Sequence, residues 1–198
     1  MDDMPRSGAE ARRRLQQAAL ELYLERGYDA TTAAQIAERA GVTERSFFRH
    51  FADKREVFFD GEAALRTALV TTVAEATPDL PPLAVLRDAF AAVVPIIEEN
   101  RPVAAARAPV LAATPALRER ALAKTEALNG AVAEALRQRG LPESEALLAA
   151  QVAMAAFGHA SRQWRADPSQ DLRTLIASSF DDLDALSQTP AAPEVRST

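Results

Sequence analysis

The stretch Thr31–Val57 reads TTAAQIAERAGVTERSFFRHFADKREV and contains two helix starts separated by one tight turn. Thr32 and Gln35 have the spacing of a capping box, which predicts a short helix that ends at Gly41. Thr43 then caps a second short helix. Two short helices joined by a tight turn have the spacing of a helix-turn-helix.

The second of these helices has two chemically different faces. Phe47 and Phe51 are one helical turn apart, so we expect both to face the core. On the opposite face, Arg45 can bond guanine O6 and N7, and Glu44 can accept from cytosine N4. The polar side chains of this face are Thr43, Glu44, Arg45, Ser46, Arg49 and His50. This division predicts a recognition helix that packs on one side and contacts DNA on the other.

The rest of the chain, from Ala9 to Leu186, predicts only helices broken by Gly and Pro. The fold class expected is all-α, with about nine helices. One helix is expected to run from Asp53 to about Ala76, and another over 83–99 with a kink at Pro95. The other expected helices cover about 11–26, 32–40, 43–50, 103–112, 115–139, 142–166 and a final segment that begins at Asp167.

Composition excludes several classes of function. The chain has 198 residues and no cysteine, which excludes disulfides, iron–sulfur clusters and thiolate zinc sites. Neither His50 nor His159 has a partner at metal-ligand spacing, so no metal site and no cofactor are expected. The net charge of −5 leaves room for only a local basic face. Without an apolar signal core or a membrane-length apolar run, we expect a cytoplasmic protein.

The opening stretch resembles the DNA-binding region of the TetR family of bacterial transcriptional regulators. The residues that carry the resemblance are Thr31-Thr32, Ile36-Ala37, Gly41-Val42-Thr43, Phe47, His50-Phe51 and Lys54, within about residues 11–60. The resemblance implies a three-helix DNA-binding domain followed by a helical domain that binds a small ligand and dimerises through its last two helices. We therefore expect a helix-turn-helix domain at 9–53, a ligand-binding and dimerisation domain at 54–188, and a disordered tail at 189–198.

Two positions depart from the family pattern. Phe48 stands where the family usually has a tyrosine that contacts the DNA backbone, and Ala34 is small where some members have a base-reading arginine. Base reading is therefore expected mainly from the second short helix. The predicted DNA contacts are Thr32, Thr43, Glu44, Arg45, Ser46, Phe48, Arg49, His50 and Lys54, with a possible backbone arm of Arg12, Arg13 and Arg14. The alternative for these three arginines is that they are simply solvated side chains at the start of a helix and do not contact DNA.

Pro95 and the Asn100–Pro102 break predict a cavity between helices, because interrupted helices leave space. The predicted ligand contacts are Phe90, Val94, Arg107, Met154, Phe157 and His159, for an apolar or amphipathic small molecule. The predicted dimer contacts are Ala149, Ala153, Trp164, Leu172, Leu175, Ile176 and Phe180. Plain core packing remains the alternative for the apolar members of both sets.

These features together predict a sequence-specific transcriptional regulator. Its expected form is a homodimer that binds a pseudo-palindromic double-stranded operator and represses until a small-molecule effector binds. A TetR-like protein whose helical domain mainly binds another protein, or an activator, are the alternatives. No nucleophile–base pair, phosphate loop or metal set is present in the sequence, so we do not expect an enzyme.

Overall fold

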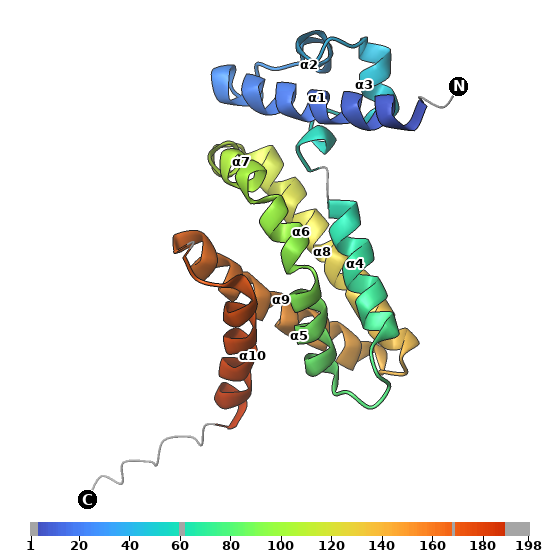
Figure 1. The fold of residues 1–198 in the computed structure, drawn as a ribbon, viewed down its shortest axis with the longest axis vertical. Helices are drawn as coiled ribbons and strands as arrows, with labels where there is room; N and C mark the ends of the chain where they lie inside the picture. The colour runs from blue at the N-terminus through green and yellow to red at the C-terminus, as the bar shows by residue number, and fades with distance from the viewer. Residues whose placement is uncertain (1–3, 60–61, 168, 189–198) are drawn as a thin grey trace, which may run out of the picture. The chain divides into compact units, whose positions relative to one another are not determined.

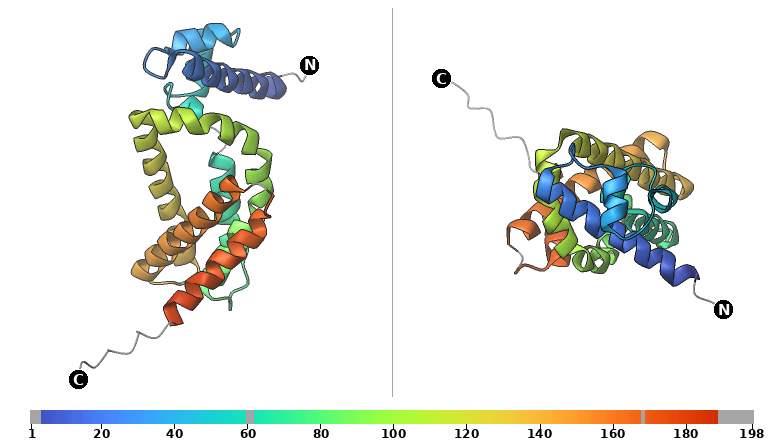
Figure 2. Two further views of the ribbon diagram at one scale, coloured as in Figure 1. Left: turned by 90° about the vertical axis from the view of Figure 1, so that its left-hand side faces the viewer. Right: turned by 90° about the horizontal axis from the view of Figure 1, so that it is seen from above.

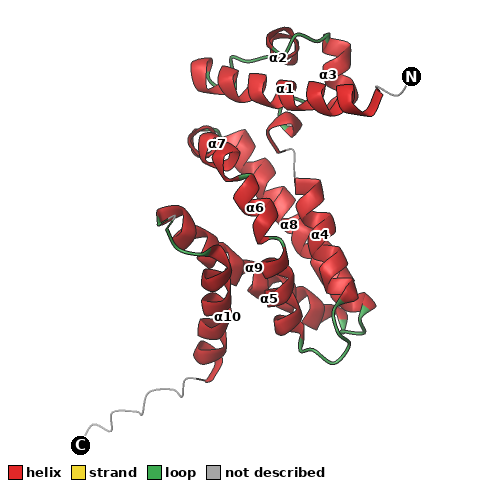
Figure 3. Ribbon diagram, in the orientation of Figure 1, coloured by secondary structure: helices red, strands yellow, loops and turns green. Residues whose placement is uncertain are grey.

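The structure is a computed structural model that describes residues 4–59, 62–167 and 169–188. Over these residues it contains ten α-helices, one 3-10 turn and no strand (Figure 3). The predicted all-α fold class is confirmed. None of the described helices combines the length and the apolar character needed to cross a bilayer.

The described residues group into two compact units, the first drawn from 1–65 and 97–127 and the second from 66–96 and 128–198. The first unit opens with a three-helix group followed by a 3-10 turn, and later helices return to it (Figure 1). Its elements are α1 (Met4–Arg26), α2 (Ala33–Arg39), α3 (Glu44–His50), η1 (Glu56–Phe59), α7 (Arg101–Ala113) and the beginning of α8 (Pro115–Gln138).

An aromatic core holds the first unit together. Phe47 is fully buried, and its ring centroid lies 5.8 Å from that of Phe51. Tyr23 packs edge-on against Tyr28, with ring centroids 5.3 Å apart, and also lies against Phe58. Burying rings of this size contributes several kcal/mol each, roughly 1.5–3 for a fully buried Phe. Apart from the exposed Phe48, the aromatic residues of the first third of the chain therefore belong to this one core.

The local helix signals in this unit are confirmed. Gly27 and Gly41 adopt φ values of 85° and 68°, the left-handed conformation that ends a helix at little cost for glycine. Thr32 caps α2 in a capping box with Gln35, with both reciprocal bonds present. Thr43 caps α3, and its Oγ1 accepts from the Ser46 amide at 3.1 Å. The turn between α2 and α3 is fixed by these caps.

The single long helix expected over 53–76 is not formed. Asp53 does accept from the Glu56 amide at 3.0 Å, but the element it opens is the short 3-10 turn η1, and α4 (Glu62–Glu75) begins later. Val57, Phe58 and Phe59 are all buried. Three consecutive residues cannot all face one side of an α-helix, whose neighbours on one face are three or four apart, so burial favours a tighter turn here.

The second unit packs α9 (Glu143–Ala166) against α10 (Leu172–Gln188), which run side by side in Figure 2, and both contact α5 (Pro82–Ala92). Buried alanines form the inner face of α9, and large aliphatic side chains of α10 pack there. The buried residues of these two helices include Ala146, Ala150, Ala153, Ala160, Leu172 and Ile176. The small side chains let the two helices approach closely.

Pro95 breaks its helix outright where a kink was expected. The segment forms α5 up to Ala92 and a separate α6 (Val94–Glu99), with Val93 between them. Pro95 has no N–H to donate to the carbonyl four residues earlier, and in the first turn of a new helix that N–H is not needed. This division adds a helix to the number expected from the sequence.

The ends of the last helices differ slightly from expectation. Gly140, at φ 99°, follows α8 as predicted. The start of α10 was expected at Asp167 but lies at Leu172, where Asp171 Oδ2 accepts from the Thr174 amide at 2.8 Å. Asp167 instead accepts from the Ser169 amide in the preceding turn. The tail expected at 189–198 lies outside the described residues.

Candidate nucleic-acid interface

The two faces of α3 differ as the sequence predicted. Phe47 is 0% exposed, whereas its neighbour Phe48 is 52% exposed and rests edge-on against it, with ring centroids 5.3 Å apart. The buried ring anchors α3 to the core of the unit. The outer face of the helix is left open to solvent, which is the arrangement that a groove-reading helix requires.

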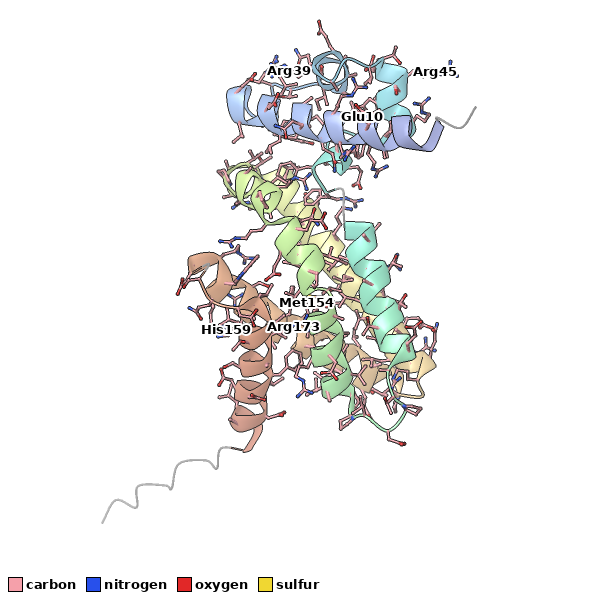
Figure 4. All side chains as sticks on the ribbon, in the orientation of Figure 1. Glu10, Arg39, Arg45, Met154, His159 and Arg173 are labelled. Atoms are coloured by element: carbon pink, nitrogen blue, oxygen red, sulfur yellow. The ribbon has the colours of Figure 1, made fainter. Side chains whose placement is uncertain are left out.

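Arg45 and Glu44 occupy the exposed first turn of α3. Arg45 extends away from the helix in Figure 4 and makes no hydrogen bond or ion pair with any described residue. Its five N–H donors are therefore available for an external acceptor. A guanidinium presented in this way can form the bidentate pair with a guanine edge.

The hydroxyl groups near the turn already accept bonds but keep a proton to donate. Thr32 Oγ1 accepts from the Gln35 amide at 3.2 Å, and Thr43 Oγ1 accepts from the Ser46 amide. Arg49 Nη2 donates to Ser46 Oγ at 3.2 Å, which orients both side chains along the outer face of α3. Each hydroxyl can still donate to a phosphate oxygen, since a Ser or Thr hydroxyl is both donor and acceptor.

Lys54 has a structural role that the sequence did not reveal. Its Nζ donates to the carbonyls of Tyr28 and Thr31, both at 2.9 Å, and lies 4.1 Å from the centre of the Tyr28 ring. The Tyr23 hydroxyl in turn donates to the Lys54 carbonyl at 2.6 Å. Of the three ammonium protons, one remains for a phosphate contact.

The charged residues after α3 are largely paired with each other. Arg55 donates two bonds to Asp53 Oδ2, at 3.1 and 2.8 Å. Burial alone would raise the pKa of Asp53, but the bonds from Arg55 and from the Glu56 amide lower it below its usual value. The pKa of Glu56 follows the same pattern. Burial alone would raise this pKa, but the bonds from Arg120 and Lys124 lower it below its usual value. The pairs of Glu56 with Arg120 and Lys124 connect the segment after α3 to α8. Because these cations are paired with carboxylates, they add little net positive charge to the surface.

The three arginines predicted as a DNA-backbone arm on α1 differ in their surroundings. The Arg12 guanidinium lies 4.6 Å from the centre of the Phe51 ring, and its Nη1 donates to the His50 carbonyl at 3.3 Å. Arg12 therefore ties α1 to the end of α3, beside the half-buried His50 ring. Arg13 and Arg14 are exposed and form no ion pair with a described residue.

The residues predicted for a ligand are not all brought together. Phe90 and Phe157 stack in the second unit, with ring centroids 4.6 Å apart and planes at 9°. Val94 is buried in the same unit. Met154 and His159 also belong to this unit, on α9 (Figure 4). His159 Nε2 is 2.7 Å from Gln163 Nε2. Arg107 belongs to the first unit, where its guanidinium lies 5.5 Å from the centre of the Phe58 ring.

The residues predicted for dimer contacts are mostly buried within one chain. Ala149 is half-buried, and the other six are buried: Ala153, Trp164, Leu172, Leu175, Ile176 and Phe180. On the same helices, Leu147 and Leu148 are 40% and 61% exposed. The open apolar surface of α9 is therefore beside the predicted residues.

Sequence reasoning missed the residues that position the candidate DNA contacts. Tyr28 and Thr31 provide the carbonyls that hold Lys54, and the Thr31 hydroxyl donates to the Gly27 carbonyl at 2.8 Å. Lys54 lies 26 and 23 positions after these two residues, so no local spacing marks the contact. The only signal in the sequence is the unusual number of aromatic residues around them.

Comparison with known proteins supports the same reading. Residues 15–60 match the family model described as bacterial regulatory proteins of the TetR family, and residues 80–188 match the model of the MftR C-terminal domain. The HTH-type transcriptional regulator TcmR of Streptomyces glaucescens is 29% identical over 178 residues, which cover 85% of this chain and 79% of that protein.

Two further similarities cover a short stretch and nearly the whole chain, respectively. The HTH-type transcriptional regulator YvkB of Bacillus subtilis is 44% identical over 43 residues, 22% of this chain and 23% of that protein. Thermus thermophilus FadR, a TetR family repressor solved in complex with lauroyl-CoA, is 25% identical with a TM-score of 0.56, covering 94% of this chain and 100% of that one. Since a model of the family's C-terminal domain matches more than half of the chain and a TetR model matches its helix-turn-helix, the chain belongs to the TetR family of bacterial transcriptional regulators, which are DNA-binding proteins and not enzymes.

Proposed function

We propose that this regulator binds a pseudo-palindromic operator as a homodimer and represses transcription until a small-molecule effector releases it. The observation that carries the proposal is the open first turn of α3, where Arg45 has no partner among the described residues while Phe47 locks the helix from behind. A rigid helix with an unengaged guanidinium is prepared to read a base edge. Since a bacterial regulator meets its operator on the chromosome, the proposed site of action is the cytoplasm.

Base reading falls to Arg45 and Glu44 of the proposed DNA-binding domain, 9–53, and phosphate contacts to polar groups of this domain and to Lys54 directly after it. The proposed phosphate contacts are Thr32, Thr43, Ser46, Arg49, His50 and Lys54, with Arg13 and Arg14 from α1. Phe48 cannot donate a hydrogen bond, but its exposed ring is suited to a thymine methyl or a sugar. Arg12 is the least suited of the arm, because its guanidinium is already engaged with Phe51 and His50.

In the proposed effector domain, 54–188, the proposed ligand contacts are the stacked Phe90 and Phe157 rings, with Val94 and Met154 nearby in sequence and His159 as a polar contact. The lauroyl-CoA bound by Thermus thermophilus FadR supports a ligand with an apolar chain. The proposed dimer contact lies on α9 and α10, where Ala149 is joined by the exposed Leu147 and Leu148.

Selection of bound sequences from a random pool of double-stranded DNA, at fixed salt, tests the core of this proposal. The expected result is an inverted repeat whose half-sites lie about 34 Å apart, one turn of DNA. No enrichment by a folded, dimeric protein would contradict it, and would favour a helical domain that binds another protein. Whether the regulator activates or represses is then decided by transcription from the selected site.

The variant Arg45→Ala tests the role of α3. It is expected to weaken operator binding by about 1–3 kcal/mol and to relax specificity at one base position. Arg173→Ala is the matched control, because Arg173 is an exposed arginine of α10 (Figure 4). An equal loss on all DNA sequences would instead make Arg45 a phosphate contact.

A further inference from the structure

A groove of about 550 Å³ lies between α1 and α7, inside the first unit. It is separate from the aromatic stack of the second unit and from the outer face of α3. Its volume falls in the range of small-molecule sites, about 300–1,000 Å³. The groove is lined on one side by residues of α1 and on the other by the first two turns of α7.

The charge around the groove is positive. Arg13 and Arg14 line it from α1 and Arg107 lines it from α7, against a single carboxylate, that of Glu10. Arg13 and Arg14 form no ion pair with any described residue. Arg107 is held from behind by the Phe58 ring, so its guanidinium is partly pre-oriented. Three guanidinium groups from two helices can converge on one anion.

The beginning of α7 adds to this potential. Asn100, the residue directly before α7, lines the groove. The first turn of α7 therefore lies at the wall of the groove, beside the arginines. An anionic group placed here would meet both a helix N-terminus and several guanidinium groups.

The groove also has an apolar part. Leu20 of α1 is 8% exposed and Val103 of α7 is 42% exposed, and both line it. An inorganic ion would leave this surface in water, whereas a short alkyl chain would cover it. Because burying apolar surface is favourable, covering it favours a ligand that has both a charged and an apolar end.

We propose that the α1–α7 groove binds a small amphipathic anion, with a phosphate or carboxylate head group at the arginines and an alkyl tail along Leu20 and Val103. This site is additional to the apolar effector site proposed for the second unit. The arginines can bind either a phosphate ester or a carboxylate, so the experiment uses a ligand of each kind.

The same arginines connect the groove to DNA binding. Arg14 reaches the turn before α3, since a Cβ at Gly41 would lie 3.7 Å from Arg14 Nη1. Arg13 and Arg14 are also proposed as phosphate contacts, and one guanidinium cannot serve the ligand and the DNA equally. The anion would therefore compete with DNA for these side chains, a consequence that rests on the proposed function, whereas the binding itself does not.

Isothermal titration of octyl phosphate and of octanoate into the DNA-free full chain tests the binding. Octyl phosphate or octanoate is expected to bind, and inorganic phosphate and octanol to bind at least about tenfold more weakly, because each satisfies only half of the groove. The result that overturns the proposal is no binding of either amphipathic anion, or binding of octanol as strong as that of the anions.

Two variants locate the site. Arg107→Gln is expected to weaken binding of the anion by about tenfold or more, the scale of losing one charge-assisted hydrogen bond. Asn100→Asp places a negative charge at the groove with a side chain of the same size and shape, so it is expected to weaken anion binding without unfolding α7. Arg118→Gln is the control, an exposed arginine of α8 outside the groove. Unchanged affinity in both groove variants would overturn the assignment.

Operator binding in the presence of the anion tests the competition. The bound anion is expected to weaken DNA binding in the unsubstituted chain and to have at least about tenfold less effect in Arg107→Gln, whose own DNA contacts are intact. Since the titration uses no DNA, a chain that binds the anion but selects no operator refutes the proposed function alone. A chain that selects an operator but binds neither anion refutes the groove alone.

Discussion

The α1–α3 group of the first unit and the α5–α9–α10 group of the second are both apolar inside, but different contacts hold them. In the first, aromatic rings are combined with directional bonds, such as those from Lys54 Nζ to the carbonyls of Tyr28 and Thr31. In the second, α9 packs against α10, and the buried side chains include Ala150 and Ala153 of α9 and Ile176 of α10. The two groups are thus built with different amounts of geometric constraint.

The difference suits the two tasks proposed for them. A recognition helix must hold its side chains in one orientation, and hydrogen bonds and interlocked rings define orientation more narrowly than aliphatic contacts do. Helices that meet through alanines can slide by small steps, the shear type of movement that effector responses often use. We infer that the first unit is the rigid reader of DNA and the second the more adaptable part.

Removing the central ring of the first unit has the largest expected effect. Phe47→Ala is expected to cost about 3–5 kcal/mol of folding free energy, as for other fully buried phenylalanines. Amide hydrogen exchange is the measurement: it should accelerate in α1–α3 and stay slow in α9 and α10. Phe48→Ala is the control, since the ring next to it is 52% exposed. Equal acceleration in both groups would show that they unfold together, and would break the comparison.

Enlarging a buried alanine of the second unit tests how tightly its helices are packed. Ala153 is 0% exposed, and Ala153→Leu is expected to cost about 1–3 kcal/mol by overpacking the α9 surface. Urea unfolding followed by circular dichroism measures the cost. Ala155→Leu, on the exposed face of α9, is the matched control. A cost near zero for Ala153→Leu would mean that the helices move apart easily, which would make the second unit even more adaptable than inferred.

Sequence predicted best what depends on neighbours along the chain. The caps at Thr32 and Thr43 and the turns at Gly27 and Gly41 are local devices, and the structure confirms each. The break beside Pro95 was expected as a kink, because the sequence cannot tell how far the helix separates at a proline. Local chemistry therefore located α3 closely.

Sequence predicted least what depends on partners far away. Arg12 bonds a carbonyl 38 positions later, and Lys54 bonds carbonyls 23 and 26 positions earlier. Residue type and spacing predicted both as phosphate contacts, because a cation near a recognition helix and a cation holding a loop look the same in one dimension. Arg107 was grouped with Phe90 for a similar reason, although the two lie in different compact units.

The smallest effect expected concerns Lys54 and separates its two roles. Lys54→Met keeps the aliphatic stem but removes the bonds to the Tyr28 and Thr31 carbonyls and the contact with the Tyr28 ring. The expected cost is about 1–2 kcal/mol of folding free energy, because two partly buried carbonyls lose a charged donor. Thermal unfolding measures this cost, and Arg49→Met, on the exposed face of α3, is the control.

The salt dependence of operator binding then shows how much of Lys54 remains for DNA. A phosphate contact adds about 0.9 to the magnitude of the slope of log affinity against log salt. A residue that only binds the carbonyls of the loop between α1 and α2 adds nothing to this slope. Because two of its three ammonium protons are already donated, we expect Lys54→Met to change this slope by less than Arg49→Met does. A larger change for Lys54 than for Arg49, with no loss of stability, would contradict the structural role. It would show that the bonds to the loop give way when phosphate is offered, and that the first unit adapts to DNA more than its directional bonds suggest.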